Sequence, residues 1–317
     1  MKNWKNVFVN VDARPHTPYA LEKSLMVAEA FRGRVSAFDS VSAADGKLPA
    51  DFPDLRIDQL MDLAAAARAH ELREELARIA PRVPVEVTVA KGSPASTLLP
   101  HARGSQADLI LMAVSASEVR QRTPVGTAML RLLREARVPL WVCSPYARRK
   151  SRVLAVVNLA GAAAANEHVV RAAVRLASLE QAELHILCVA DQACRQVLAA
   201  RSFAREPVND ERELRQLVDE VVGVGSSVLA PHRADAIALH TIEKAVLELE
   251  PDFLVLSRDG SDFGGLPGTY FVERLFGRVD SSMLLLPGQE LATQKARAPR
   301  ERWPGSGMVE RASAASA

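Results

Sequence analysis

The chain repeats its own sequence pattern at about the length of one domain. Three segments recur in the same order: 5–12 (KNVFVNVD) as 152–158 (RVLAVVN), 107–112 (ADLILM) as 251–256 (PDFLVL), and 126–127 (GT) as 268–269 (GT). The members of each pair lie about 140 to 150 residues apart, which exceeds a solenoid repeat and suits one compact domain. The sequence therefore predicts a tandem duplication, with domains at 1–147 and 148–288 and a disordered tail at 289–317.

Each copy alternates short apolar runs with segments of helical period, which is typical of β-α-β units in a parallel α/β sheet. Strands are predicted at 5–12, 35–41, 84–90, 108–114 and 138–143, and again at 152–158, 183–189, 234–240, 252–257 and 281–286. Helices are predicted at 19–31, 58–79, 96–103 and 127–136, and again at 164–178, 210–229, 241–250 and 269–277. Strands as apolar as 109–114 should be covered by helices on both faces.

Composition indicates a soluble globular protein. The 317 residues are 48% hydrophobic and carry a formal net charge of +2, which is too little charge to indicate a nucleic-acid partner. The chain opens without a signal-peptide pattern and no apolar run reaches bilayer length, so we expect no membrane partner and a cytoplasmic location. Cys143 and Cys188 fall in predicted strands, where reduced thiols behave as small apolar side chains. Neither a disulfide nor a metal site is expected.

Several features together resemble the universal stress protein family. They are the opening strand that ends in Asp12, the strand that begins with Asp108, the helix start at 126–127, and the closing strand at 138–142. The join at 152–160 is similar to the E-type tandem proteins of proteobacteria, and the resemblance covers nearly the whole chain apart from the tail.

This resemblance implies two five-stranded, doubly wound, Rossmann-like parallel sheets. In such a sheet the ligand crevice lies at the carboxyl ends of the strands, where the strand order reverses. The family also implies that the closing strands at 138–143 and 281–286 pair with each other. The chain would then be an intramolecular pseudo-dimer, and we further expect it to form a homodimer.

Many family members bind ATP through a loop written G-x-x-G, nine residues, then G-[ST]. The matching positions of the first copy are Ala113, Ala116, Gly126 and Thr127, with Asp12 at the end of the opening strand. Two glycines have thus become alanine, and each added Cβ occupies space that a phosphate cradle needs.

The matching positions of the second copy are Ser257, Gly260, Gly268 and Thr269, in a loop two residues shorter than the pattern. Arg258 is the only cation of that loop, and Asn158 replaces the aspartate of the opening strand. The candidate cofactor-binding residues are therefore these: Asp12, Gly126, Thr127, Ser257, Gly260, Gly268 and Thr269. ATP is the candidate cofactor, although neither copy has the complete pattern.

Other motifs give no catalytic constellation. Asp262-Phe263-Gly264 lacks the remaining kinase motifs, and 259–262 lacks the ligand spacing of a calcium loop. His16 and His168 are interpreted as surface residues near helix starts, and Ser115 has no neighbouring base in sequence. The helix at 58–79 has an apolar stripe that should pack on the sheet: Leu60, Leu63, Ala64, Ala67 and Leu72.

Three functions remain open at this point. The leading hypothesis is a non-catalytic tandem universal stress protein that binds a protein partner or a small ligand during stress. The second is an ATP-binding protein with slow hydrolysis or a sensor role, which would use the second copy. The third is a carrier of a hydrophobic small molecule.

Overall fold

A computed structural model describes residues 3–12, 17–43, 56–113, 126–144, 151–158, 163–189, 229–234, 238–258, 268–276 and 278–287. The elements of the first half are β1 (Asn6–Asn10), α1 (Thr17–Ala30), β2 (Arg34–Val41), α2 (Ile57–Ile79), β3 (Val85–Lys91), α3 (Pro94–Gly104), β4 (Leu109–Ala113), α5 (Thr127–Glu135) and β5 (Leu140–Cys143). Those of the second half are β6 (Arg152–Asn158), α6 (Ala163–Glu180), β7 (Glu183–Val189), β8 (Leu229–Ala234), α9 (Ala238–Leu249), β9 (Phe253–Ser257), α10 (Gly268–Phe276) and β10 (Ser282–Leu286).

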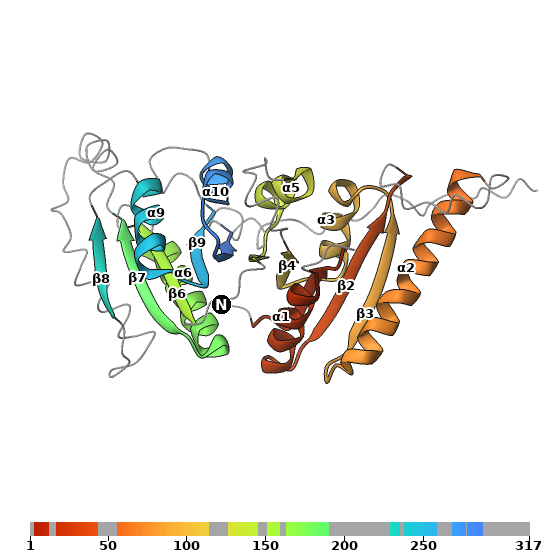
Figure 1. Ribbon diagram of the computed structural model, residues 1–317, viewed down its shortest axis with the longest axis horizontal. Coiled ribbons are helices and arrows are strands. Elements are labelled where there is room, and N and C mark those ends of the chain that lie inside the picture. The colour runs from red at the N-terminus through yellow and green to blue at the C-terminus, as the bar shows by residue number, and fades with distance from the viewer. Residues whose placement is uncertain are drawn as a thin grey trace, which may run out of the picture.

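All strands belong to one ten-stranded sheet in the order β3-β2-β1-β4-β5-β10-β9-β6-β7-β8. Every neighbouring pair is parallel except β5 and β10, which are antiparallel. Read from either outer edge, the order is the same: outer strand, second strand, opening strand, fourth strand, closing strand. Figure 1 shows β8, β7, β6 and β9 in one half and β3, β2 and β4 in the other. The expected pairing of the two closing strands is therefore present.

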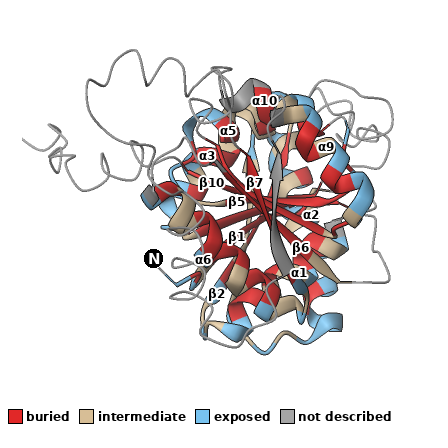
Figure 2. Cartoon of the chain, turned by 90° about the vertical axis from the view of Figure 1, so that its left-hand side faces the viewer, coloured by how far each residue is buried: buried red, intermediate tan, exposed pale blue. Residues whose placement is uncertain are grey.

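Helices cover both faces of this sheet, as the apolar strands predict. One core cluster packs α1, α2 and α6 on one face, and a second packs α3, α5, α9 and α10 on the other. The central strands run buried through the molecule between these layers (Figure 2). Buried parallel strands of this kind carry apolar side chains on both faces, which explains why β4, β9 and β10 read as continuous apolar runs.

The two halves also repeat local contacts. The amide of Asn6 donates to the carboxylate of Asp108 at 3.1 Å, and the amide of Arg152 donates to Asp252 at 3.0 Å. After α1 and after α6, Arg32 and Gln181 both have a φ of 50°, in the left-handed region that ends helices. The same left-handed backbone conformation thus follows the equivalent helix in each half.

The seam between the halves is an antiparallel ladder flanked by polar contacts. Trp141 of β5 stands opposite Leu284 of β10, and its ring packs edge-on against Phe253. On the face of α1 and α6, Lys23 donates to both carboxylate oxygens of Glu180, and both side chains are largely buried. An ion pair in this environment fixes the relative position of two helices that come from different halves.

One predicted strand of the second half is wrong. The segment 234–240 was expected to be extended, but β8 is Leu229–Ala234 and the helix α9 begins at Ala238. The apolar residues Leu239, Ile242 and Val246 recur at helical spacing and pack against the sheet. The strand itself is short and polar and contains Pro231, as is common for a strand at the edge of a sheet.

The remaining differences concern α2 and the chain outside the described residues. In α2 the buried residues are Ala64, Leu72 and Leu76, whereas Leu63 and Ala67 of the predicted stripe are exposed. The predicted helix at 210–229 lies outside the described residues apart from Leu229, which belongs to β8, and so does the predicted tail at 289–317. None of the described helices is long and apolar enough to cross a lipid bilayer.

Candidate functional site

The strand order reverses between β1 and β4 in the first half and between β6 and β9 in the second. In a doubly wound sheet a ligand crevice lies at the carboxyl ends of such neighbouring strands. In the first half these ends bring Asp12 after β1 close to Ala113 of β4, because Asn10 pairs with Met112. In the second half the corresponding ends are Asn158 and Ser257.

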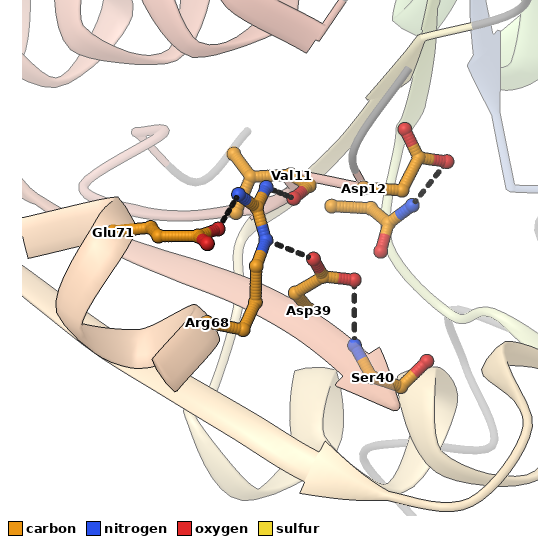
Figure 3. A network of polar contacts seen from close by, with 7 residues as sticks. Val11, Asp12, Asp39, Ser40, Arg68 and Glu71 are labelled. Atoms are coloured by element: carbon orange, nitrogen blue, oxygen red, sulfur yellow. Dashed lines mark hydrogen bonds and ion pairs between the residues drawn. The ribbon is translucent and has the colours of Figure 1, made fainter. Parts of the chain in front are cut away.

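Arg68 of α2 organises the carboxyl ends of β1 and β2 (Figure 3). Its Nε donates to Oδ2 of Asp39 at 2.8 Å, and its Nη2 donates to the carbonyl of Val11 at 3.1 Å. Its Nη1 donates to Glu71 at 3.0 Å. The other carboxylate oxygen of Asp39 accepts the amide of Ser40 at 2.7 Å. One side chain of a covering helix therefore ties two strand ends together.

Among the described residues, the carboxyl ends of β1 and β2 carry several carboxylates around Arg68. The carboxylate of Asp39 is almost fully buried, with 3% of its side chain exposed. Partial burial opposes the charge of Arg68, but hydrogen bonds to Asp39 and Glu71 outweigh it and raise the pKa of the guanidinium. Asp12 lies beside the network and accepts a long 3.4 Å hydrogen bond from Asn10. Three N–H groups of this guanidinium thus donate to Asp39, Glu71 and the carbonyl of Val11, and Asp12 lies nearby.

The first-half candidates Gly126 and Thr127 lie at the exposed start of α5. Gly126 has a φ of −57°, and a Cβ added to it would meet nothing within 4 Å. Neither backbone strain nor packing in the described part of the chain thus requires glycine at this position. Ala113 is buried at the end of β4, where its methyl group belongs to the core cluster that contains α1. Ala116 lies outside the described residues.

Of the second-half candidates, Ser257 is buried at the end of β9. Gly268 and Thr269 are the first residues of α10, and Gly260 lies outside the described residues. Among the described elements, β9 ends at Ser257 and is followed by α10, just as β4 ends at Ala113 and is followed by α5.

Arg258, the only cation of the second loop by sequence, contacts the first half. Its side chain is buried and donates to four backbone carbonyls there. These contacts are Nη1 to Leu132 at 2.9 Å and Leu133 at 3.2 Å, and Nη2 to Ala136 at 2.7 Å and Val138 at 3.0 Å. A guanidinium at the carboxyl end of α5 donates to carbonyls of the last turn and of the residues after it, and its charge opposes the helix dipole.

The titratable groups considered earlier form no catalytic arrangement in the part of the chain that the structure describes. His168 lies in the second turn of α6, where burial and the nearby charge of Arg175 lower its pKa. Cys143 and Cys188 are buried in β5 and β7. Among the described residues no group of three His, Cys, Asp or Glu side chains could hold a metal ion.

Sequence reasoning missed Arg68 although a signal was present. The buried positions of α2 are Ala64, Leu72 and Leu76, and Arg68 continues this series at a spacing of four residues. Positions four apart lie on one face of a helix. A charged residue in the middle of a buried face requires a partner, and in this fold the partner is Asp39.

Comparison with known proteins agrees with this architecture. The model of the universal stress protein family matches residues 3–144. A structure of a protein of unknown function from Pseudomonas aeruginosa PAO1 is 17% identical, covers 92% of this chain and 95% of its own, and has a TM-score of 0.65. A candidate universal stress protein from Pseudomonas aeruginosa UCBPP-PA14 gives the same values.

A universal stress protein from Archaeoglobus fulgidus DSM 4304 is 16% identical, covers 90% of this chain and 97% of its own, and has a TM-score of 0.60. At this identity these structures show a shared fold alone. No curated protein matches the sequence. Residues 3–144 thus match the universal stress protein family model and have the doubly wound strand order described above.

Proposed function

We propose that the chain is a tandem universal stress protein that acts in the stress response by non-catalytic binding of a protein partner or a small ligand. In this proposal residues 148–288 form a second domain of the same kind, and neither crevice is a working nucleotide site. The repeated strand order, the paired contacts of Asp108 and Asp252, and the matching helix ends at Arg32 and Gln181 support the duplication.

The hydrogen bonds of Arg68 are the main evidence that the first half lacks a working nucleotide site. A phosphate site needs free N–H donors or cations directed at the ligand. At the first crevice the guanidinium of Arg68 donates to Asp39, Glu71 and the carbonyl of Val11. The surrounding carboxylates would repel a triphosphate, because like charges at short range are unfavourable. Within the described residues, three donors of Arg68 at the carboxyl ends of β1 and β2 are thus bonded to the protein itself.

The second half supports the same conclusion through Arg258. This side chain donates four hydrogen bonds to backbone carbonyls at and just after the carboxyl end of α5. Moving it toward a phosphate would leave the buried carbonyls of Leu132 and Ala136 without this donor, which costs free energy. Nucleotide binding in the second half is the alternative function, and it would depend on Gly268, Thr269 and the loop before them.

Thermal unfolding with nucleotides tests the proposal. A ligand at a hundred times its dissociation constant stabilises a protein by about 2.7 kcal/mol, which shifts the unfolding midpoint by a few degrees. We expect millimolar Mg-ATP to give no shift beyond that of Mg-GTP or AMP, and no phosphate release above the buffer rate. An ATP-specific rise that disappears in Gly268→Val would overturn the proposal and assign a nucleotide site to the second half.

A further inference from the structure

A pocket of about 400 Å³ lies at the edge of the first half opposite its crevice. It opens between the carboxyl ends of α3 and α5 and reaches the beginning of β4. Its lining residues are Leu99, Ala102, Arg103, Gln106, Ala107, Ile110, Ala136, Arg137 and Val138. The volume lies within the range of sites that hold small organic molecules. None of the candidate nucleotide residues contributes to this lining.

The floor of the pocket is apolar. Leu99, Ala102, Ala107, Ile110 and Ala136 are buried members of the core cluster on this face of the sheet. Three of these five side chains are alanines, and such small side chains leave room for a ligand above the floor. A hydrocarbon chain placed there would leave water and contact aliphatic groups, which is the general source of affinity in such sites.

The mouth of the pocket is basic. Arg137 is exposed and makes neither a hydrogen bond nor an ion pair with any residue in the described ranges. Arg103 lies 3.7 Å from the carboxylate of Glu135, and the same carboxylate accepts a hydrogen bond from Arg131 at 3.1 Å. One carboxylate is therefore shared by two arginines, and a third arginine remains open at the rim.

Helix carbonyls beside a pocket normally disfavour an anion, because the carboxyl end of a helix carries partial negative charge. This effect is offset at α5 by Arg258, which donates to the carbonyls of Ala136 and Val138, two of the residues that line the pocket. At α3 the amide of Ala107 donates to the carbonyl of Ala102 at 3.1 Å. The carbonyls nearest the floor are thus already bonded, and the arginines dominate the charge.

We propose that this pocket binds a small organic acid with an aliphatic body, such as a medium-chain carboxylate. The carboxylate is held by Arg137, with Arg103 beside it, and the chain lies on the floor formed by Leu99, Ala107 and Ile110. Arginine suits this role because its planar fork can donate two parallel hydrogen bonds to a carboxylate. The inference concerns a site separate from both crevices and does not depend on the function proposed for them.

Calorimetric titration of the full chain with octanoate tests the site. We expect saturable binding with one octanoate per chain, and Arg137→Gln should weaken it about tenfold or more because a charged hydrogen-bond pair is lost. Arg134→Gln is the matched control. Arg134 is also an exposed arginine near the end of α5, but it does not line the pocket, so this change should leave the affinity within about twofold.

A second variant tests the location independently of charge. Val138→Phe places a larger side chain at the half-buried rim of the pocket and should abolish binding, while an unchanged circular dichroism spectrum and unfolding midpoint report an intact fold. Octanol, which has the same chain without the charge, should bind at least tenfold more weakly, at about the cost of one charged hydrogen bond. The proposal is wrong if octanoate does not saturate at millimolar concentration, if both arginine variants weaken it equally, or if the folded Val138→Phe protein binds as before.

Discussion

Arg68 connects the carboxyl ends of two neighbouring strands of the sheet. Its side chain comes from α2, yet it holds the carbonyl of Val11 after β1 and the carboxylate of Asp39 in β2. The carboxylate of Asp39 is buried and accepts hydrogen bonds from Arg68 and from the amide of Ser40. The contact therefore matters for the fold as well as for the charge that the crevice presents.

We expect Arg68→Met to lower the free energy of unfolding by about 2–4 kcal/mol, because it removes a charged donor from the buried carboxylate of Asp39. Urea denaturation of the full chain measures this change. Arg73→Met is the matched control, since Arg73 is exposed on the same helix and its loss should cost less than about 0.5 kcal/mol. The double variant Asp39→Asn, Arg68→Met should be more stable than the sum of the single changes predicts. Equal costs for Arg68→Met and Arg73→Met would show that the network is unimportant.

At the scale of elements, most helices and strands could be predicted from hydrophobic periodicity, and the exceptions have physical causes. The central strands are apolar on both faces and lie within a residue or two of their predicted bounds. The edge strand β8 has no such signal, because Pro231, His232 and Arg233 suit an exposed edge and resemble a loop in sequence. The strand was therefore predicted at the next apolar residues, some of which belong to α9.

The candidate site was less predictable than the fold. Motif spacing identified the ends of β1, β4 and β9 and the starts of α5 and α10. It could not reveal that Arg68 reaches Val11 across 57 positions of sequence or that Arg258 reaches Leu132 across 126. Long-range contacts of this kind follow from the packing of a helix on a sheet and of one half on the other. Local spacing can place Arg68 on the buried face of its helix, but it does not identify the residues that Arg68 or Arg258 contacts.

The carboxyl end of α5 depends on Arg258, a residue of the other half. We expect Arg258→Met to cost about 3 kcal/mol or more, because four carbonyls lose a charged donor in a buried setting. Hydrogen exchange should then accelerate at the amide of Ala136, which bonds to the carbonyl of Leu132.

Arg258→Lys should recover only part of this stability, because an ammonium group cannot reach four carbonyls with the geometry of a guanidinium. Arg278→Met is the control from the same half. Arg278 forms an exposed ion pair with Glu243, and such surface pairs contribute about 0–1 kcal/mol. If α5 keeps its exchange protection in Arg258→Met, then the contact across the seam does not hold the helix end.

The whole molecule depends on its seam because each half leaves an apolar closing strand that the other covers. Leu140 and Trp141 of β5 pair with Leu285 and Leu284 of β10, and all four side chains are buried. Removal of the second half would expose a buried strand edge, which is a template for pairing with another chain. It would also remove Glu180 from Lys23.

We therefore expect the fragment 1–147 to self-associate through β5, so that a second copy replaces β10 and Trp141 of one copy lies opposite Trp141 of the other. Sedimentation equilibrium should show dimers at micromolar concentration, and the unfolding midpoint of the fragment should rise with its concentration because association stabilises the folded form. In the full chain β5 is already covered, so the same concentration series should leave the seam unchanged. A fragment that remains a stable monomer at high concentration would mean that β5 tolerates an open edge, and the seam would then serve to position the two crevices rather than to protect an apolar strand.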